Sequence, residues 1–414
     1  MMQAQPSNAS VPNGGAMQNN PQEQIFTASR QAHRNNFMDM PSMLKAPEEI
    51  ACFSYDENLN LHLDSRSLAY YFSPSPRGSE KFIDLSKGMN DFRQRDDSKD
   101  DHLHGLLTAI MDKEKKNQAK LDAHFISYRG MMTNLLTLPY SNGDQWVMKL
   151  TSFDGTIFIE EDKQAKLKAR KNDKKGHQSN KNLQFYGFKF ETLYTIPDIW
   201  DNVSREEIEG RDEKVVDNHP QYCSVVKTSI GETSMIIGGE VDCIWDQKIE
   251  GETRHEWIEL KTTEWIPPYI RPDTRDRKLH NYDWRKLKYW AQSYLIGCPR
   301  VVVGKRDYKT DRLMMPLDVF YTLDIPKEAT TWDARVCKQT WAGLLKWLHE
   351  KISGQPGVWK LSKKGGEDVV RLVHDEPTGT GEILTDEFIA HRQSMTPSSA
   401  GVQVDETDDV QMEE

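Results

Sequence analysis

Runs of alternating apolar and polar residues recur through the middle of the chain, and helical patterns interrupt them. Residues 146–159 hold two such runs around Asp154-Gly155, which predicts a β-hairpin. Residues 332–352 give the clearest amphipathic helix. Because strands and helices are mixed in this way, the sequence favours an α/β (α+β) fold, a single large domain around mixed β-sheets with flanking helices. Helices are also predicted over residues 101–123 and 279–296, and strands over residues 184–194, 221–228, 233–245, 256–263, 300–305, 313–323, 359–361 and 369–373.

The negative charge of the chain is concentrated at one end. The 414 residues include 54 Lys and Arg and 64 Asp and Glu, for a formal net charge of −10. Residues 375–414 contain 11 acidic residues and one basic residue, Arg392, so this segment alone carries −10. Residues 1–374 then hold 53 basic and 53 acidic groups and are neutral. The total charge therefore describes a tail and does not exclude a nucleic-acid partner for the rest.

Composition divides the chain into three parts and excludes several protein classes. Residues 1–24 are polar and of low complexity, and we expect them to be disordered; we expect residues 375–414 to form an acidic, flexible tail. The folded domain is thus assigned to residues 25–374. No apolar stretch approaches a membrane span or the core of a secretory signal. The five cysteines are far apart and form no CxxC pair, so neither a disulfide framework nor a thiolate zinc site is indicated, and we expect an intracellular protein.

Acidic residues embedded in two apolar strands are the most informative feature. Glu240 and Asp242 follow Gly238-Gly239, and Glu259 and Lys261 come 17 residues later. Residues two apart on a strand share a face, so each pair projects together. If the two strands are neighbours, three carboxylates and one ammonium group meet on one patch.

Such a patch suits divalent metal ions. Oxygen clusters bind hard cations, and two cations a few Å apart support phosphodiester cleavage. The order Asp, then Glu-x-Lys, is the spacing of the PD-(D/E)xK nucleases, although Glu-x-Lys alone is more often an exposed strand face with ordinary charge pairs. Here apolar residues such as Trp257 and Ile258 flank Glu259, and acids in such surroundings are costly unless paired or metal-bound. The sequence therefore favours a metal site.

Two more residues are candidates for the same site. Glu191 ends the aromatic-rich segment 187–191, which we interpret as another strand. Gln292 lies in the helix predicted over residues 279–296. An amide on a helix surface is the alternative reading for Gln292, but its apolar neighbours leave the two readings about even.

Taken together, these segments resemble the DXO family of RNA 5′-end decapping nucleases, which includes the fungal nuclear decapping proteins. Five blocks carry the resemblance in family order. They are Tyr128-Arg129-Gly130-Met131-Met132-Thr133, Gly187 to Glu191, Glu240-Val241-Asp242, Glu259-Leu260-Lys261, and Trp290-Ala291-Gln292-Ser293.

The resemblance assigns roles to individual residues. It implies that Glu240, Asp242, Glu259 and Lys261 are catalytic. It implies divalent cations, two Mg²⁺ or Mn²⁺, held by Glu191, Glu240, Asp242, Glu259 and the main-chain carbonyl of Leu260. It further implies that Arg129, Glu240, Lys261 and Gln292 bind the substrate, with Arg129 facing the 5′-phosphate end. A structural ion pair is the alternative reading for Arg129 alone.

The resemblance also implies a reaction and a setting. The family hydrolyses RNA near its 5′ end and releases pyrophosphate from triphosphate ends, a cap dinucleotide from incompletely methylated caps, or NAD from NAD-capped RNA. It implies a nuclear location and a 5′–3′ exoribonuclease as partner, with no membrane. Two alternatives stay open, namely a protein that mainly stabilises or activates an exoribonuclease, and a DNA-directed PD-(D/E)xK nuclease.

Two basic segments add signals for RNA. Residues 163–181 hold eight basic residues and one acid, and residues 269–288 hold seven basic and three acidic residues together with Tyr269, Tyr282 and Trp284. Basic and aromatic residues mixed in this way suit single-stranded RNA. The first segment could equally be a solvated loop or a nuclear import patch, and the aromatic residues of the second could be core residues.

Overall fold

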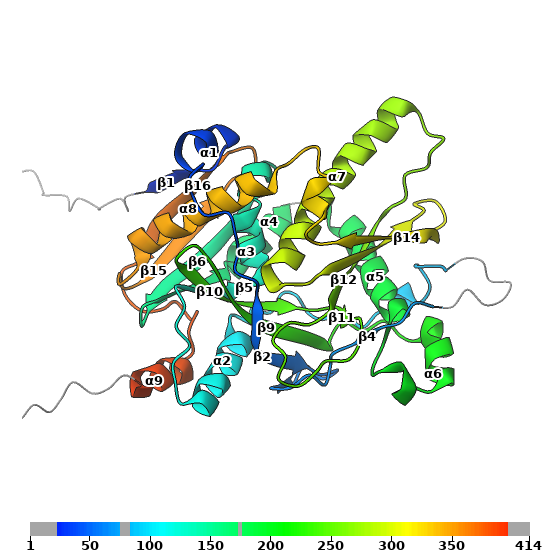
Figure 1. Cartoon of the computed structure of the whole chain (residues 1–414), viewed down its shortest axis with the longest axis horizontal. Helices are drawn as coiled ribbons and strands as arrows, with labels where there is room; N and C mark the ends of the chain where they lie inside the picture. The colour runs from blue at the N-terminus through cyan, green and yellow to red at the C-terminus, as the bar shows by residue number, and fades with distance from the viewer. Residues whose placement is uncertain (1–22, 75–82, 173–175, 396–414) are drawn as a thin grey trace, which may run out of the picture.

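Two mixed β-sheets form the body of the protein (Figure 1), whose computed structural model describes residues 23–74, 83–172 and 176–395. Parallel and antiparallel pairs occur in both sheets, as predicted. In spatial order, the described strands of the larger sheet are β1 (Gln24–Thr27), β16 (Val369–Glu376), β15 (Val358–Lys363), β6 (Trp146–Phe153), β7 (Thr156–Glu161), β5 (Phe125–Tyr128), β10 (Thr233–Glu240), β9 (Gln221–Ile230), β2 (Glu48–Tyr55) and β3 (Leu61–His62). Those of the smaller sheet are β14 (Leu313–Tyr321), β13 (Arg300–Arg306), β12 (Trp257–Glu264), β11 (Cys243–Ile244), β4 (Tyr70–Tyr71) and β8 (Thr195–Ile196).

Helices cover both faces of the larger sheet. Successive side chains of a strand point to opposite faces, and in β7 Ile157 and Ile159 join one buried cluster while Phe158 joins another. The first cluster includes residues of α3 and α8, and the second includes residues of α2 and α9. The described helices are α1 (Arg30–Asn36), α2 (His104–Asn117), α3 (Arg129–Leu136), α4 (Lys163–Asn172), α5 (Gly176–Tyr194), α6 (Arg205–Glu209), α7 (Pro272–Ile296), α8 (Ala334–Ile352) and α9 (Asp386–Met395).

The hairpin and the long helices agree with the sequence prediction. The β6–β7 turn places Asp154 and Gly155 at φ 49° and 78°, the left-handed values that a tight Asp-Gly hairpin turn requires. The helices predicted over residues 101–123, 279–296 and 332–352 correspond to α2, α7 and α8. None of the helices in the described part of the chain combines the length and the apolar character that crossing a bilayer requires.

The strand predicted over residues 184–194 is wrong, because this segment is the second half of α5. The aromatic residues look alternating in sequence, but the buried side chains include Phe185, Lys189, Phe190 and Leu193, a spacing of three to four residues. That spacing is helical. Glu191 therefore reaches the site from a helix and not from a strand.

The expectation of a flexible tail from residue 375 is wrong for residues 375–395. Strand β16 continues to Glu376, and α9 packs on the larger sheet. Phe388 is buried and its ring lies 5.5 Å from that of Phe158. The acidic composition hid a short helix whose buried Phe388 packs on Phe158 of β7. The remainder of the predicted tail, and residues 1–22 of the predicted N-terminal tail, lie outside the described residues.

Candidate functional site

The site lies where the chain crosses from the larger sheet to the smaller one. Strand β10 ends at Glu240, and β11 begins at Cys243, so Asp242 lies in the crossover. The strand that pairs with β12 is β11 and not β10. The backbone N–H of Leu260 on β12 donates to Asp242 Oδ2 over 2.6 Å. The two acidic segments are thus neighbours through this short crossover.

Strand β12 supplies a buried carboxylate with two cationic partners. Glu259 is 1% exposed, and Arg129 Nη1 donates to its Oε2 over 2.7 Å. Its Oε1 lies 2.5 Å from Lys261 Nζ, an ion pair without hydrogen-bond geometry. Arg129 and Glu259 are 130 residues apart in sequence, and β5 delivers the arginine to the first position of α3.

Two glycines let the surrounding elements close on the site. A Cβ at Gly304 of β13 would lie 2.8 Å from the ring of Phe190, so glycine allows α5 to pack on the smaller sheet and brings Glu191 to the crossover. A Cβ at Gly239 of β10 would lie 2.8 Å from Ile296 and 3.3 Å from Arg129. The absence of side chains at these positions therefore sets how closely the helices approach the acids.

The four acids influence one another electrostatically. Burial alone would raise the pKa of Glu259, but the charges of Arg129 and Lys261 outweigh this effect and lower the pKa to about 2. Burial and the charge of Glu259 raise the pKa of Asp242 to about 7. Burial and neighbouring carboxylates also raise the pKa of Glu240, and that of Glu191 well above its usual range. Perturbations of this kind cluster at functional sites.

Two cavities meet at Glu240. The first has a volume of about 580 Å³ and is lined by Glu191, Glu240 and Asp242 among others. The second, of about 470 Å³, is lined by Arg129, Glu240 and Gln292. The structure thus brings together all the side chains that the sequence singled out, with Glu240 on the wall of both spaces.

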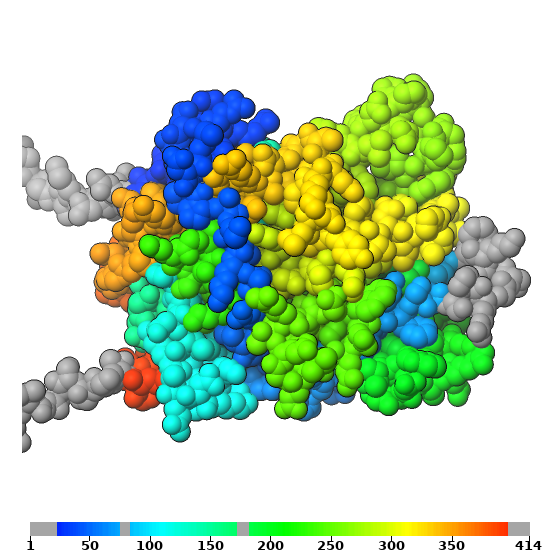
Figure 2. All heavy atoms as spheres, viewed as in Figure 1, coloured from blue at the N-terminus to red at the C-terminus, as the bar shows by residue number. Residues whose placement is uncertain are grey.

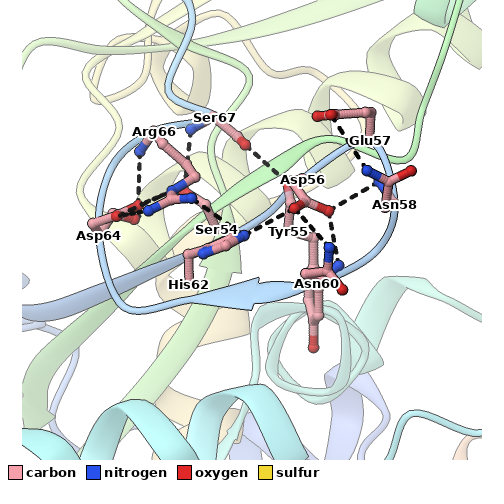
Figure 3. Close-up of polar contacts among 10 residues, drawn as sticks. All are labelled: Ser54, Tyr55, Asp56, Glu57, Asn58, Asn60, His62, Asp64, Arg66 and Ser67. Atoms are coloured by element: carbon pink, nitrogen blue, oxygen red, sulfur yellow. Dashed lines mark hydrogen bonds and ion pairs between the residues drawn. The ribbon is translucent and has the colours of Figure 1, made fainter.

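Sequence reasoning missed the basic residues of the first cavity. Arg66 lines it from the segment after β3, and Figure 3 shows its guanidinium group folded onto Asp64, with 2.7 Å between Nη2 and Oδ2. In the preceding turn, Asp56 accepts hydrogen bonds from the backbone N–H groups of Asn58 and Asn60 (Figure 3). The Asp-x-Asn-x-Asn pattern signals this turn, but no local pattern indicates that it borders the acids.

The side chains present match the chemistry of a divalent cation. In the described part of the chain, no three His, Cys, Asp or Glu side chains are placed to coordinate a metal ion together. When all four carboxylates are ionised, as metal ligands must be, they exceed the two cations by two negative charges. Among the described residues, the buried Glu259 Oε1 faces Lys261 Nζ as an ion pair and accepts no hydrogen bond of ordinary geometry. Hard cations satisfy such oxygens, so the donor set fits.

A buried carboxylate near the second cavity predicts a pH effect on stability. His102 lines this cavity, and its Nδ1 lies 3.1 Å from Glu160 Oε2. Burial raises the pKa of Glu160 from 4.5 to about 7. The folded state therefore holds a proton that the unfolded chain releases, and this stabilisation, complete below about pH 4.5, is lost as the pH rises through 7.

We expect a Glu160→Gln variant to lack this contribution. Between pH 5 and pH 8, its free energy of unfolding relative to wild type should rise by about 3 kcal/mol, as measured by urea denaturation. Glu161→Gln, at the half-buried ion pair with Lys166, serves as the control. Parallel pH profiles for wild type and Glu160→Gln would contradict the prediction.

Comparison with known proteins places the chain in a family. A family model described as "RAI1 like PD-(D/E)XK nuclease" matches residues 45–389. The decapping nuclease RAI1 of Neurospora crassa is 38% identical over 365 residues, which cover 86% of this chain and 85% of that protein. Candida albicans Rai1, crystallised with pU5 and Mn²⁺, has a TM-score of 0.75 at 26% identity, over 86% of this chain and 98% of that chain.

Scheffersomyces stipitis Rai1, crystallised with (3′-NADP)⁺ and a calcium ion, has a TM-score of 0.76 at 30% identity and the same coverage. The family match, the identity to RAI1 proteins and the mixed-sheet fold with its acids at the crossover agree with one another. The chain belongs to the RAI1-like PD-(D/E)XK nucleases.

Proposed function

We propose that this protein is a metal-dependent hydrolase that removes caps and other non-standard groups from RNA 5′ ends. The observation that carries the proposal is the convergence of Glu191, Glu240, Asp242 and Glu259 with Arg129 and Lys261 at the sheet crossover. The activity is the one named for the RAI1 relatives. The same site provides no particular support for a purely non-catalytic activator.

The residues present divide the work between holding the metal and holding the substrate. The four carboxylates and the Leu260 carbonyl would hold the divalent cation, which when bound polarises phosphoryl oxygens and lowers the pKa of water. Lys261 offers its ammonium group to a phosphate oxygen. Arg129, fixed by Glu259, presents the remaining donors of its fork. Gln292 can donate to the nucleotide chain from α7.

The nature of the metal and the substrates is inferred from relatives. Mn²⁺ and Ca²⁺ accompany neighbouring structures, and the oxygen-only donor set equally suits Mg²⁺, so we propose two Mg²⁺ or Mn²⁺ ions. The complex of a relative with (3′-NADP)⁺ supports NAD-capped RNA as one substrate. Incompletely methylated caps and 5′-triphosphate ends complete the proposed substrate range.

We also propose a nuclear location and association with a 5′–3′ exoribonuclease. Both come from the resemblance to the fungal nuclear decapping proteins. Affinity purification from nuclear extract followed by mass spectrometry tests the association, and recovery without any exoribonuclease would reject it.

The test of the enzymatic proposal is product analysis. Purified protein is incubated with Mg²⁺ or Mn²⁺ and RNAs that carry a 5′-triphosphate, an unmethylated cap, an NAD cap or a 5′-monophosphate. We expect mass spectrometry to find pyrophosphate, a cap dinucleotide or NAD from the first three, and no release in EDTA. Absence of all three products with either metal would refute the proposal.

A further inference from the structure

The N-terminal half of α7 projects from the body of the protein (Figures 1 and 2). We call residues 265–281, which comprise the loop after β12 and the first turns of α7, the arm. Most arm side chains from Pro268 onward are exposed, in contrast to the C-terminal half of α7, where Leu287 and Trp290 are buried. An α-helix extended into solvent in this way contributes little to the core, so its surface is free for binding.

One face of α7 links the arm to the active site. Gln292, Arg285, Lys278 and Arg271 follow one another at intervals of seven residues. Seven residues rotate an α-helix by nearly two full turns, so the three side chains within α7 form one stripe. Arg271 is the N-cap residue of α7 and lies at the outer end of this stripe. The stripe spans about 32 Å, from the cavity that contains Glu240 to the tip of the arm.

Contacts along the stripe show which way it faces. Arg285 Nη1 donates to Thr263 Oγ1 over 2.9 Å, and Lys278 Nζ lies 2.5 Å from Glu264 Oε1. Both partners lie on β12, a few residues beyond Lys261 of the active site. The stripe therefore lies beside the strand that carries the catalytic acid, and the two elements leave the site together.

The charge of the arm is positive on this side. Arg271, Arg275 and Arg277 are exposed, and within the described residues the structure gives their guanidinium groups no ion pair or hydrogen bond. The acids of these turns, Asp273 and Asp276, lie about 140° or more from Lys278 around the helix, at 100° per residue. Of the four cations of the arm, Lys278 is the one that forms an ion pair among the described residues, with Glu264.

Exposed aromatic rings accompany the cations. Tyr269 is 79% exposed, and its ring lies 6.1 Å from that of Trp265. Tyr308, in the β13–β14 turn, is 54% exposed and lies beneath Lys278 Nζ at 5.4 Å. Cations that track a phosphate backbone, combined with rings on which bases stack, are the general requirements for binding a single strand.

We propose that the α7 arm binds the single-stranded body of the RNA substrate as it leaves the active site. This inference rests on the proposed function, because the RNA must enter the site by its 5′ end. At a stacked spacing of about 3.4 Å per nucleotide, the stripe accommodates about nine nucleotides. Affinity should therefore rise with RNA length to about ten nucleotides and then level off.

The test compares RNA length with charge removal on the arm. A triple variant, Arg271→Ala, Arg275→Ala and Lys278→Ala, is measured against wild type by fluorescence anisotropy with 3′-labelled 5′-monophosphate RNAs of 3 and 15 nucleotides in EDTA. Each lost phosphate contact lowers log K by about 0.7 at 0.1 M salt. We expect 15-nucleotide RNA to bind the variant roughly ten- to hundredfold more weakly, and the slope of log K against log salt to fall by about 2.

Controls separate this inference from the enzymatic proposal. The variant should bind the 3-nucleotide 5′-monophosphate RNA like wild type, because this RNA does not reach the arm. With Mn²⁺ in place of EDTA, the variant should also release pyrophosphate from short 5′-triphosphate RNAs of 3 nucleotides as fast as wild type. A matched variant that loses three exposed cations elsewhere, Lys115→Ala, Lys346→Ala and Lys351→Ala, should keep wild-type affinity for the long RNA.

Failure of wild type to hydrolyse the short substrates would reject the proposed function alone. Equal affinity and salt slope of wild type and the arm variant for the long RNA would reject the arm as an RNA surface and favour an acidic protein partner.

Discussion

Replacing Glu259 by glutamine is expected to lower the rate of RNA 5′-end hydrolysis by about a thousandfold or more, equivalent to about 4 kcal/mol of transition-state stabilisation. Glu259 is a proposed metal ligand, and it also fixes Arg129 and Lys261. Asp242→Asn should cause a loss of similar size, because it removes another proposed ligand. Rates are measured under single-turnover conditions with saturating Mn²⁺. Glu256→Gln, at the exposed ion pair with Arg300 before β12, is the control and should retain wild-type activity.

The same two variants should have opposite effects on stability in the absence of metal. Glu259→Gln leaves the half-buried cations Arg129 and Lys261 without their nearest counter-charge, which is itself fully buried. Breaking a buried pair costs about 3–5 kcal/mol. Asp242→Asn removes a carboxylate whose pKa is raised by burial and by Glu259, so it relieves repulsion and should stabilise by about 1–3 kcal/mol. The new amide oxygen can still accept from the Leu260 N–H.

Urea denaturation in EDTA checks the two signs. If the free energy of unfolding changed in the same direction in both variants, the charges around Glu259 would not be what controls stability. Near-wild-type hydrolysis by either variant would count against its role in the site.

Local patterns correctly predicted the β6–β7 hairpin and the strands β9, β10 and β12. The Asp154-Gly155 turn and the apolar, β-branched residues of β9, β10 and β12 are signals between near neighbours in sequence, so one segment contains the whole signal. Such a signal also correctly paired Glu259 with Lys261, which share a face of β12. The convergence of these residues with Glu240 was predicted only on the condition that the strands were neighbours.

Long-range features lay beyond that reasoning. The ion pair of Arg129 with Glu259 depends on the order of strands in both sheets, and no local pattern encodes it. The apolar residues of segment 184–194 fit both a strand, with a repeat of two, and a helix, with a repeat of three to four. The segment is a helix in the structure, where Phe190 packs against Gly304 of β13. The roles of the site residues in binding and catalysis stay predictions until variants are measured.

The segment after residue 375 was misjudged because composition was averaged over 40 residues. The acids of its described part are exposed, but one basic residue is fully buried. Arg392 of α9 pairs with Glu114 of α2, with 2.7 Å between Nη2 and Oε1 and 3.0 Å between Nε and Oε2. Both side chains are 0% exposed. Arg392 Nη1 also lies 3.2 Å from Asp154 Oδ2 in the β6–β7 turn. These acidic partners are far away in sequence, so the composition of the segment does not reveal them.

Replacing Arg392 by alanine is expected to reduce the free energy of unfolding by about 3–5 kcal/mol. Within the described residues, the change leaves the buried Glu114 carboxylate with the His391 ring and the Leu121 N–H as partners. It also removes the guanidinium group 5.1 Å from the Phe388 ring, on the face where α9 covers β7. The measurement is urea denaturation followed by tryptophan fluorescence.

The double replacement Arg392→Met with Glu114→Leu distinguishes two causes of instability, the loss of the ion pair and the loss of the packing of α9. If the cost of Arg392→Ala comes from the unpaired Glu114, exchanging both charges for apolar side chains should recover most of the stability, since well-packed apolar pairs often equal buried ion pairs. His391→Ala should cost less, because Arg392 still neutralises Glu114. A double variant as unstable as Arg392→Ala would attribute the loss to packing of α9, and a wild-type-like Arg392→Ala would mean that α9 does not stabilise the domain. Either result would contradict the prediction that the terminal helix is held to α2 by charge.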